Sequence, residues 1–140
     1  MKKTLALILC VVFVAFAFIS CGENTSDGEQ PAAATLWDSA MYKEDAAVGE
    51  GEITFTLAIE AEGKSVVLTV STNESVLGNA LYNYGLVNDP SFFDTANGMH
   101  ASWDADQAWW AFYVGDTMAS YGVSDEVLSS GNSYKLVYTK

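Results

Sequence analysis

The histidine at position 100 is followed closely by two carboxylates, Asp104 and Asp106, and it is the only histidine in the chain. Imidazole nitrogen and carboxylate oxygen both ligate divalent cations, so this group could be considered a metal site. The ligand set is incomplete, because Asp104 and Asp106 lack the further ligands and the glycine of an EF-hand loop. Acidic residues are also common in turns without any metal. We therefore predict no metal site.

Catalytic chemistry is not expected either. Hydrolysis by an activated serine would need His100 as its base, and the chain has no G-x-S-x-G motif. Carboxylate pairs are abundant but unspecific in so acidic a chain, and a glycosidase needs two of them facing a cleft. Cysteine catalysis is excluded if Cys10 is removed and Cys21 is modified, as argued below. We predict that the protein is not an enzyme and has no catalytic residues.

The strongest chemical signal is aromatic, because two tryptophans, a phenylalanine and a tyrosine lie between positions 109 and 113. On a strand, Trp110 and Phe112 would share one face, and Trp109 and Tyr113 the other. Exposed aromatic surface suits flat ligands and partner proteins. The alternative is burial beneath the irregular segment from Trp37 to Tyr42. The predicted ligand contacts are Trp103, Trp110, Phe112 and Tyr121, with Phe92 and Phe93 on a mobile rim.

The N-terminus has the pattern of an export signal. Lys2 and Lys3 precede an apolar run of 15 residues from Leu5 to Ile19, which is shorter than the roughly 20 residues of a membrane-spanning helix. The ending of residues 18–21, Phe-Ile-Ser-Cys, resembles the bacterial lipobox, with Phe in place of the usual Leu. We predict a lipoprotein signal peptide over residues 1–20 and lipidation at Cys21; the alternatives are an ordinary cleaved signal and an uncleaved anchor.

Cleavage after residue 20 removes Lys2 and Lys3 and changes the formal charge from −12 to −14. The remaining chain has no arginine and no basic patch, so binding to nucleic acid is excluded. Residues 21–34 are polar and acidic, with Gly and Pro, and are predicted to be a flexible tether. Residues 35–140 are long enough to form one domain with its own core. We expect this domain to lie outside the cytoplasm, held to the bacterial membrane through Cys21.

Alternating apolar residues predict an antiparallel hairpin early in this domain. The run from Ile53 to Ile59 alternates with a period of two, and Val66 to Val70 repeats the pattern after a turn at residues 62–64. From Val76 to Tyr84 the apolar period becomes helical, with Thr72 or Asn73 as the expected cap and Gly85 as the stop. Gly78 should weaken this helix unless a close backbone approach requires it.

Further strands are predicted over residues 98–103, 108–114 and 133–139. Turns are predicted at residues 104–107 and at Gly115-Asp116, and Ser124 could cap one helical turn reaching Leu128. The predicted order is strand, strand, helix, strand, strand, strand. One helix has one sheet face to cover, so the predicted class is α+β, a roll with a mostly antiparallel sheet of about five strands.

A set of motifs resembles a known family. The supporting residues are Gly49-Glu50-Gly51, the stretch Val76-Leu77-Gly78-Asn79-Ala80-Leu81, Gly85-Leu86-Val87, Asn97-Gly98, the block from Trp103 to Asp116, Gly122-Val123-Ser124 and the ending from Tyr134 to Thr139. Together they resemble DUF4430, the transcobalamin-like C-terminal domain often found in bacterial lipoproteins. The resemblance covers residues 36–139. This chain departs from the family at Gly115-Asp116, where Asn-Gly is frequent, and in the segment Ser91-Phe92-Phe93-Asp94.

The resemblance implies a β-grasp-like fold and, through the animal cobalamin carriers, a role in covering one face of a corrinoid. In those carriers an α-helical barrel supplies the other half of the site, and this chain has no such barrel.

Two functions follow as hypotheses. In the first, a lipid-anchored module captures a small planar ligand, corrinoid-like, outside the cell and presents it to an uptake system or transporter; no other cofactor is expected. In the second, the domain docks another exported protein or a surface polymer and has no small-molecule pocket.

Overall fold

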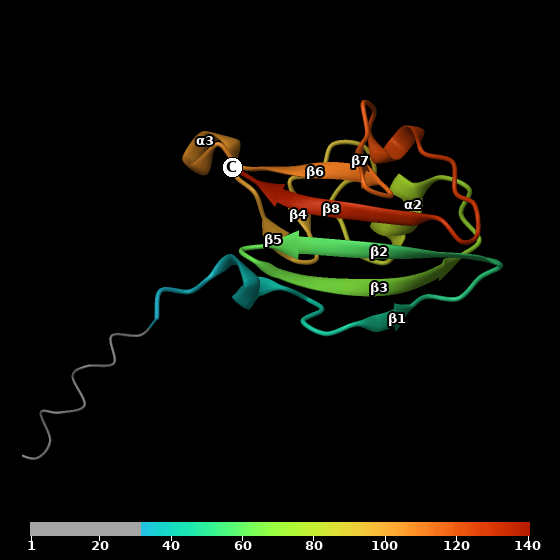
Figure 1. The fold of residues 1–140 in the computed structure, drawn as a ribbon, viewed down its shortest axis with the longest axis horizontal. Helices are drawn as coiled ribbons and strands as arrows, with labels where there is room; N and C mark the ends of the chain where they lie inside the picture. Colours follow the sequence, from blue (N-terminus) through green and yellow to red (C-terminus); the bar gives the residue numbers. More distant parts are fainter. Residues whose placement is uncertain (1–31) are drawn as a thin grey trace, which may run out of the picture. The chain divides into compact units, whose positions relative to one another are not determined.

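The computed structural model describes residues 32–140, so the predicted signal peptide, Cys21 and residues 21–31 of the predicted tether lie outside the described residues. Figure 1 shows the arrangement of the elements. In chain order they are η2 (Leu36–Ser39), β1 (Ala46–Val48), β2 (Ile53–Ala61), β3 (Lys64–Thr72), α2 (Leu77–Asn83), β4 (Thr95–Ala96), β5 (Met99–His100), α3 (Trp103–Asp106), β6 (Trp109–Val114), β7 (Thr117–Met118), η3 (Val123–Asp125) and β8 (Ser133–Thr139).

The predicted antiparallel hairpin is confirmed as strands β2 and β3, which pair from Ile53 with Thr72 to Ala61 with Lys64. Its two-residue loop is Glu62-Gly63, and both residues have positive φ, at 53° and 74°. Positive φ at both loop residues is typical of the two-residue hairpin turn whose twist matches the twist of the paired strands. Glycine adopts positive φ without steric cost. Alternate side chains along both strands are buried. The period of two in the sequence therefore corresponds to one face of the hairpin that points into the core.

The main sheet has six strands in the order β1-β3-β2-β8-β6-β7, and β4 pairs with β5 in a separate two-stranded sheet. Three of the five neighbouring pairs in the main sheet are antiparallel, whereas β1–β3 and β2–β8 are parallel. The class is compatible with the predicted α+β, but the sheet is mixed and has one strand more than expected. Strands β1 and β7 were not predicted and are short, with three and two residues, whereas the predicted strand over residues 98–103 does not join this sheet.

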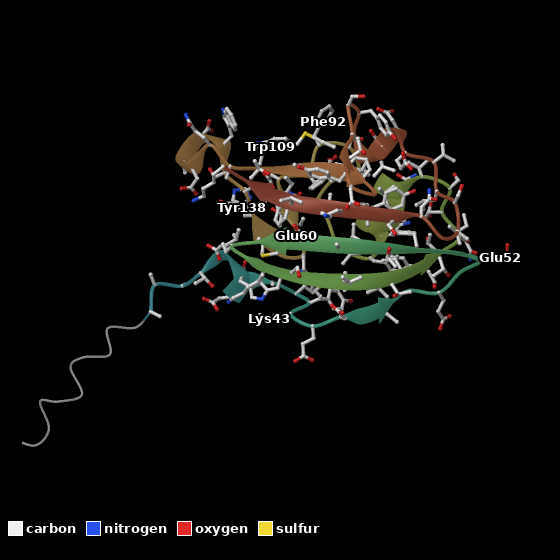
Figure 2. All side chains as sticks on the ribbon, viewed as in Figure 1. Lys43, Glu52, Glu60, Phe92, Trp109 and Tyr138 are labelled. Carbon is white, nitrogen blue, oxygen red and sulfur yellow. The ribbon has the colours of Figure 1, made fainter. Side chains whose placement is uncertain are left out.

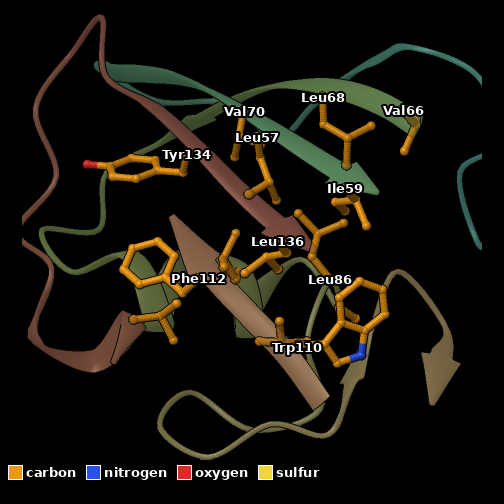
Figure 3. Close-up of a cluster of buried hydrophobic side chains, with 14 of the residues drawn as sticks. Leu57, Ile59, Val66, Leu68, Val70, Leu86, Trp110, Phe112, Tyr134 and Leu136 are labelled. Carbon is orange, nitrogen blue, oxygen red and sulfur yellow. The ribbon is translucent and has the colours of Figure 1, made fainter. Parts of the chain in front are cut away.

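One face of the main sheet forms the core (Figure 3). Leu57, Ile59, Leu68 and Leu136 are fully buried and come from the three central strands. Helix α2 adds Leu77, Ala80 and Leu81 to the same cluster. Burying each large apolar side chain contributes about 1.5–3 kcal/mol. All members of this cluster lie between Trp37 and Leu136, so the unit Thr35–Lys140 supplies its own core.

Helix α2 is shorter than predicted and has a different N-terminus. Its N-cap is Val76, which offers no side-chain hydrogen bond, so the expectation of a Thr72 or Asn73 cap is wrong. Thr72 instead accepts the backbone N–H of Glu74, and Asn73 accepts that of Glu52. Gly78 is explained by a close approach, since a Cβ there would clash with the carbonyl oxygen of Pro90.

The segment between α2 and β6 differs most from the prediction. Of the predicted strand over residues 98–103, only Met99 and His100 form a strand, and they pair with β4. The predicted turn at residues 104–107 is the short helix α3, with Ser102 as its N-cap. Residues 123–125 form a 3-10 turn after Gly122, in place of the turn expected from Ser124 to Leu128. The last strand matches its predicted bounds.

Candidate functional site

Five of the six predicted aromatic contacts line one pocket of about 240 Å³: Phe92, Phe93, Trp110, Phe112 and Tyr121. They come from three segments, which are the loop before β4, strand β6 and the loop after β7. Trp109, Met118 and Val123 also line this aromatic pocket. Figure 2 shows Phe92 and Trp109 on the side of the molecule that carries β6. The fold therefore brings together aromatic rings that are up to 29 residues apart in sequence.

The rim of the aromatic pocket is built by a polar turn. The Oδ1 atom of Asp89 accepts the backbone N–H groups of Ser91 and Phe92, at 2.7 and 2.8 Å. These bonds, the one from Phe92 first, lower the pKa of the Asp89 carboxyl. The turn presents the Phe92 ring, which is 95% exposed, while Phe93 packs against the core. Phe92 therefore stands at the mouth of the aromatic pocket, where its ring is accessible from solvent.

The floor of the pocket belongs to the core. Trp110 and Phe112 share the inner face of β6 and are 6% and 7% exposed (Figure 3). Trp110 packs edge-on against Tyr138, with ring centroids 5.6 Å apart, and Phe112 packs in the same way on Tyr121 at 6.3 Å. Their burial is explained by the fold itself, so these two rings alone give no support to ligand binding. Among the described residues, Trp110 Nε1 is buried with no hydrogen-bond partner.

Tyr121 connects the pocket to a buried carboxylate. The hydroxyl groups of Tyr121 and Tyr134 donate to the two oxygens of Glu126, at 2.7 and 2.9 Å. Glu126 is only 9% exposed. The hydrogen bond to Glu126 raises the pKa of Tyr121, and desolvation raises the pKa of Tyr134 to about 12. The network holds the loop after β7 against β8 and thereby fixes one wall of the aromatic pocket.

Trp103 does not join the other predicted contacts. It lies on α3, is 63% exposed and lines a different pocket of about 360 Å³. We call this the tryptophan pocket; it is lined by Asp94, His100, Ala101, Ser102, Trp103, Asp104, Ala108 and Trp109. Trp109 lines both pockets.

The residues considered as a metal cluster are divided by the structure. His100 and Asp104 line the tryptophan pocket, whereas Asp106 lies 3.9 Å from Lys140. His100 pairs instead with Asp94, with 3.3 Å between Nδ1 and Oδ1. Within residues 32–140, no group of three or more His, Cys, Asp or Glu side chains is arranged to hold a metal ion.

The pocket residues that sequence reasoning missed include Met118, Trp109 and Asp94. Met118 was overlooked because β7 has only two residues and no alternating pattern. Trp109 was assigned to the strand face away from the candidate site, yet it sits at the start of β6 and reaches both pockets. Asp94 could have been noticed, since it ends the Phe92-Phe93 segment that departs from the family pattern.

Comparison with family models and with curated protein sequences finds no match. Solved structures that are similar to this chain include the following two. One is a "putative metal binding protein" from Ruminococcus gnavus, with 22% identity and a TM-score of 0.59 over 64% of this chain and 98% of that one. The other is haptocorrin in complex with Cbi, with 17% identity and a TM-score of 0.48 over 63% of this chain and 25% of haptocorrin. The first likeness is one of fold alone, and the second is too weak to carry an argument.

Membrane attachment was predicted through Cys21, which lies outside the described residues. In the part of the chain that the structure describes, no helix is both long and apolar enough to span a bilayer.

Proposed function

We propose that this protein is a lipid-anchored extracytoplasmic binding module, and that its aromatic pocket captures a small, largely planar ligand for an uptake system. One observation carries the proposal: aromatic rings from three separate segments converge on one concavity, and the rim ring Phe92 is 95% exposed. Flat ring faces provide contact area at small conformational cost, which favours a planar ligand.

The size of the pocket constrains how a ligand would bind. Small-molecule sites usually have about 300–1,000 Å³, and the aromatic pocket has about 240 Å³. A corrin ring is much larger than this space, so a corrinoid would lie across the mouth of the pocket and contact its exposed rim. The exposed side chains there are Phe92, Trp109, Met118 and Tyr121.

The strand order supports the proposed fold, and the N-terminal sequence supports the proposed location outside the cytoplasm. Strand β8 lies between the β2–β3 hairpin and β6, and it runs parallel to β2. We assign this order to the β-grasp-like roll expected of a DUF4430 domain. Export and lipidation rest on Lys2, Lys3 and the lipobox-like ending at Cys21. No catalytic step and no nucleic-acid partner form part of the proposal.

Calorimetry with cobalamin and cobinamide tests the proposal on a fragment of residues 32–140, because corrinoid absorbance would interfere with tryptophan fluorescence. We expect saturable binding that weakens about tenfold or more in Phe92→Ala, as for an exposed aromatic anchor. Phe92 is a better probe than Trp110, whose truncation would damage the core. Tyr82→Ala is the control, since Tyr82 is 50% exposed on α2 and lines neither pocket.

The docking hypothesis is the second candidate, and the projection of Phe92 favours it. A ring that is 95% exposed fits a recess in a partner at least as well as it fits a ligand. If corrinoids give no heat, a photo-crosslinking amino acid at position 92 in living cells should capture one exported protein. The same label at position 82 should not capture that protein.

A further inference from the structure

The tryptophan pocket is a second concavity that the proposed function does not use. It lies where β5, α3 and the start of β6 meet, and its volume is about 360 Å³. Two indoles line it, Trp103 at 63% and Trp109 at 41% exposure. Core packing does not account for rings that remain this exposed, and the volume falls in the usual range for small-ligand sites.

The backbone that carries the two indoles is well defined. Ser102 caps α3 by accepting the N–H of Ala105 at 3.2 Å, and its carbonyl also accepts the N–H of Ala108 at 3.1 Å. Gln107 adopts φ 54° and redirects the chain from α3 into β6. The backbone at Trp103 and Trp109 is therefore held at either end of one tight connection, which limits the backbone ordering cost of binding.

Carboxylates accompany the indoles. The Oδ1 atom of Asp94 accepts hydrogen bonds from Thr95 Oγ1 and Asn88 Nδ2, both at 2.8 Å, and lies 3.3 Å from His100 Nδ1. These contacts, with that of Thr95 first, lower the pKa of the Asp94 carboxyl, so it is ionised at neutral pH. Asp104 also lines the pocket. Of the lysines in residues 32–140, none forms an ion pair with Asp94 or Asp104.

We propose that the tryptophan pocket binds an organic ammonium cation. The negative face of an indole attracts a cation, and tryptophan is the best aromatic partner for quaternary ammonium groups. Asp94 and Asp104 supply opposite charge at the same concavity. The negative formal charge, −12 for the chain and −14 after the predicted cleavage, draws cations toward the protein and repels anions. A neutral sugar would also stack on an indole, but it would gain nothing from this charge.

Choline and 3,3-dimethylbutan-1-ol form a matched pair of probes, because they have nearly the same shape and only choline is charged. We would follow their methyl proton signals by NMR while adding the fragment of residues 32–140. We expect saturable binding of choline, with an upfield shift from the indole rings, and binding of the neutral alcohol at least tenfold weaker. Higher salt should weaken the binding of choline.

Variants locate the site. Trp103→Ala should weaken choline binding by about 2- to 30-fold, the range for cation–indole contacts. Asp94→Asn should weaken it and reduce its salt dependence. Tyr82→Ala should leave it unchanged, and so should Phe92→Ala, which separates this site from the aromatic pocket. Trp103 and Asp94 are largely exposed, so both variants should fold, which circular dichroism verifies.

Three results would overturn the inference. Equal binding of choline and the neutral alcohol would mean simple apolar contact. Tighter binding of a neutral methyl glucoside than of choline would make the pocket a carbohydrate site. A lack of saturation by about 10 mM choline would mean that the indoles and carboxylates do not act together. The variants keep this proposal apart from corrinoid binding, because Trp103 and Asp94 line only the tryptophan pocket and Phe92 lines only the aromatic pocket.

Discussion

Glu126 is a buried acid that receives no cation in the described part of the chain. Its charge is stabilised by hydrogen bonds from the hydroxyl groups of Tyr121 and Tyr134, and Asn132 donates in turn to Tyr134 at 2.9 Å. A buried carboxylate without such donors would be strongly destabilising. The two tyrosines can donate these hydrogen bonds only while their hydroxyl groups are protonated. The wall of the aromatic pocket should therefore lose this support at alkaline pH.

Tyr134→Phe should change the alkaline stability profile. The folded state raises the pKa of Tyr134 to about 12, whereas an unfolded tyrosine titrates near about 10. This stabilisation is fully present below the unfolded pKa and is lost as pH rises through the folded one. Urea midpoints between about pH 9 and 12 should fall more gently in Tyr134→Phe. The variant should also lose about 1–3 kcal/mol near neutral pH, because Glu126 loses a donor.

A control variant and one contradicting outcome make this assignment falsifiable. Tyr138→Phe serves as the control, since the Tyr138 hydroxyl has no hydrogen bond within residues 32–140, where its ring packs on Trp110, and its profile should follow the wild type. An unchanged alkaline slope in Tyr134→Phe would show that Tyr134 does not retain its proton in the folded state.

Gly78→Ala should destabilise the domain even though alanine favours helices. The added Cβ would clash with the backbone oxygen of Pro90, which cannot move as a side chain can. Overpacking of this kind costs about 1–3 kcal/mol. Asn79→Ala, at the exposed neighbouring position, should change the free energy of unfolding by no more than about 0.5 kcal/mol. Urea unfolding of both variants checks this, and equal stability would mean that the segment at Pro90 can shift.

At the level of elements, the loop before β4 is organised by its own polar side chains. Asn88 Oδ1 accepts the backbone N–H groups of Asp94 and Thr95, and Asp89 accepts those of Ser91 and Phe92. The loop therefore holds Phe92 at the aromatic pocket and Asp94 at the tryptophan pocket.

Asp89→Ala should loosen the rim of the aromatic pocket. The pKa of Asp89 is lowered below its ordinary 3.8, so its contribution to loop order is present above that value and is lost as pH falls through the lowered pKa. We expect faster hydrogen exchange at the amides of Ser91 and Phe92 and weaker binding in the aromatic pocket. Ser91→Ala, which keeps both bonds, is the control. Unchanged exchange in Asp89→Ala would contradict this role.

The elements differ in how well the sequence predicts them. Strands β2, β3 and β8 are long enough for alternation to mark one buried face, and the Glu62-Gly63 turn has a clear backbone requirement. Strand β1 has three residues and pairs with β3 across 22 positions, so no local pattern reveals it. Helix α3 was predictable, because Ser102 followed by acidic residues is a typical helix start.

The candidate site was predicted only in part, for a physical reason. The aromatic residues of the 92–93 loop, β6 and Tyr121 were identified by type, and the structure brings them to one pocket. Which rings stay in water depends on strand pairing: Trp110 and Phe112 face the core because β6 is in register with Tyr138 and Leu136 of β8. The register is set by pairing between β6 and β8, which are distant in sequence. Neither strand alone therefore contains a sequence pattern that reveals it.

For the whole molecule, Cys21→Ser tests the predicted anchor. Loss of the thiol should prevent lipidation and move the protein from the membrane fraction to the soluble fraction outside the cytoplasm. Cys10→Ser is the matched control, since Cys10 lies inside the predicted signal peptide and should not affect location. Cell fractionation and the mass of the N-terminal peptide measure the outcome. An unmodified Cys21 in the wild type would refute the anchor.

Strand β8, the last strand of the described chain, lies at the centre of the main sheet (Figure 1). Until residues 133–139 are available, the β1-β3-β2 and β6-β7 parts share no strand pairing, and Thr56 must meet Ser133 across 77 positions. Such distant pairing makes folding slow. The proposed export requires the chain to pass unfolded through a membrane pore. The order of the strands would favour this passage, because the main sheet cannot be completed until residues 133–139 have been synthesised.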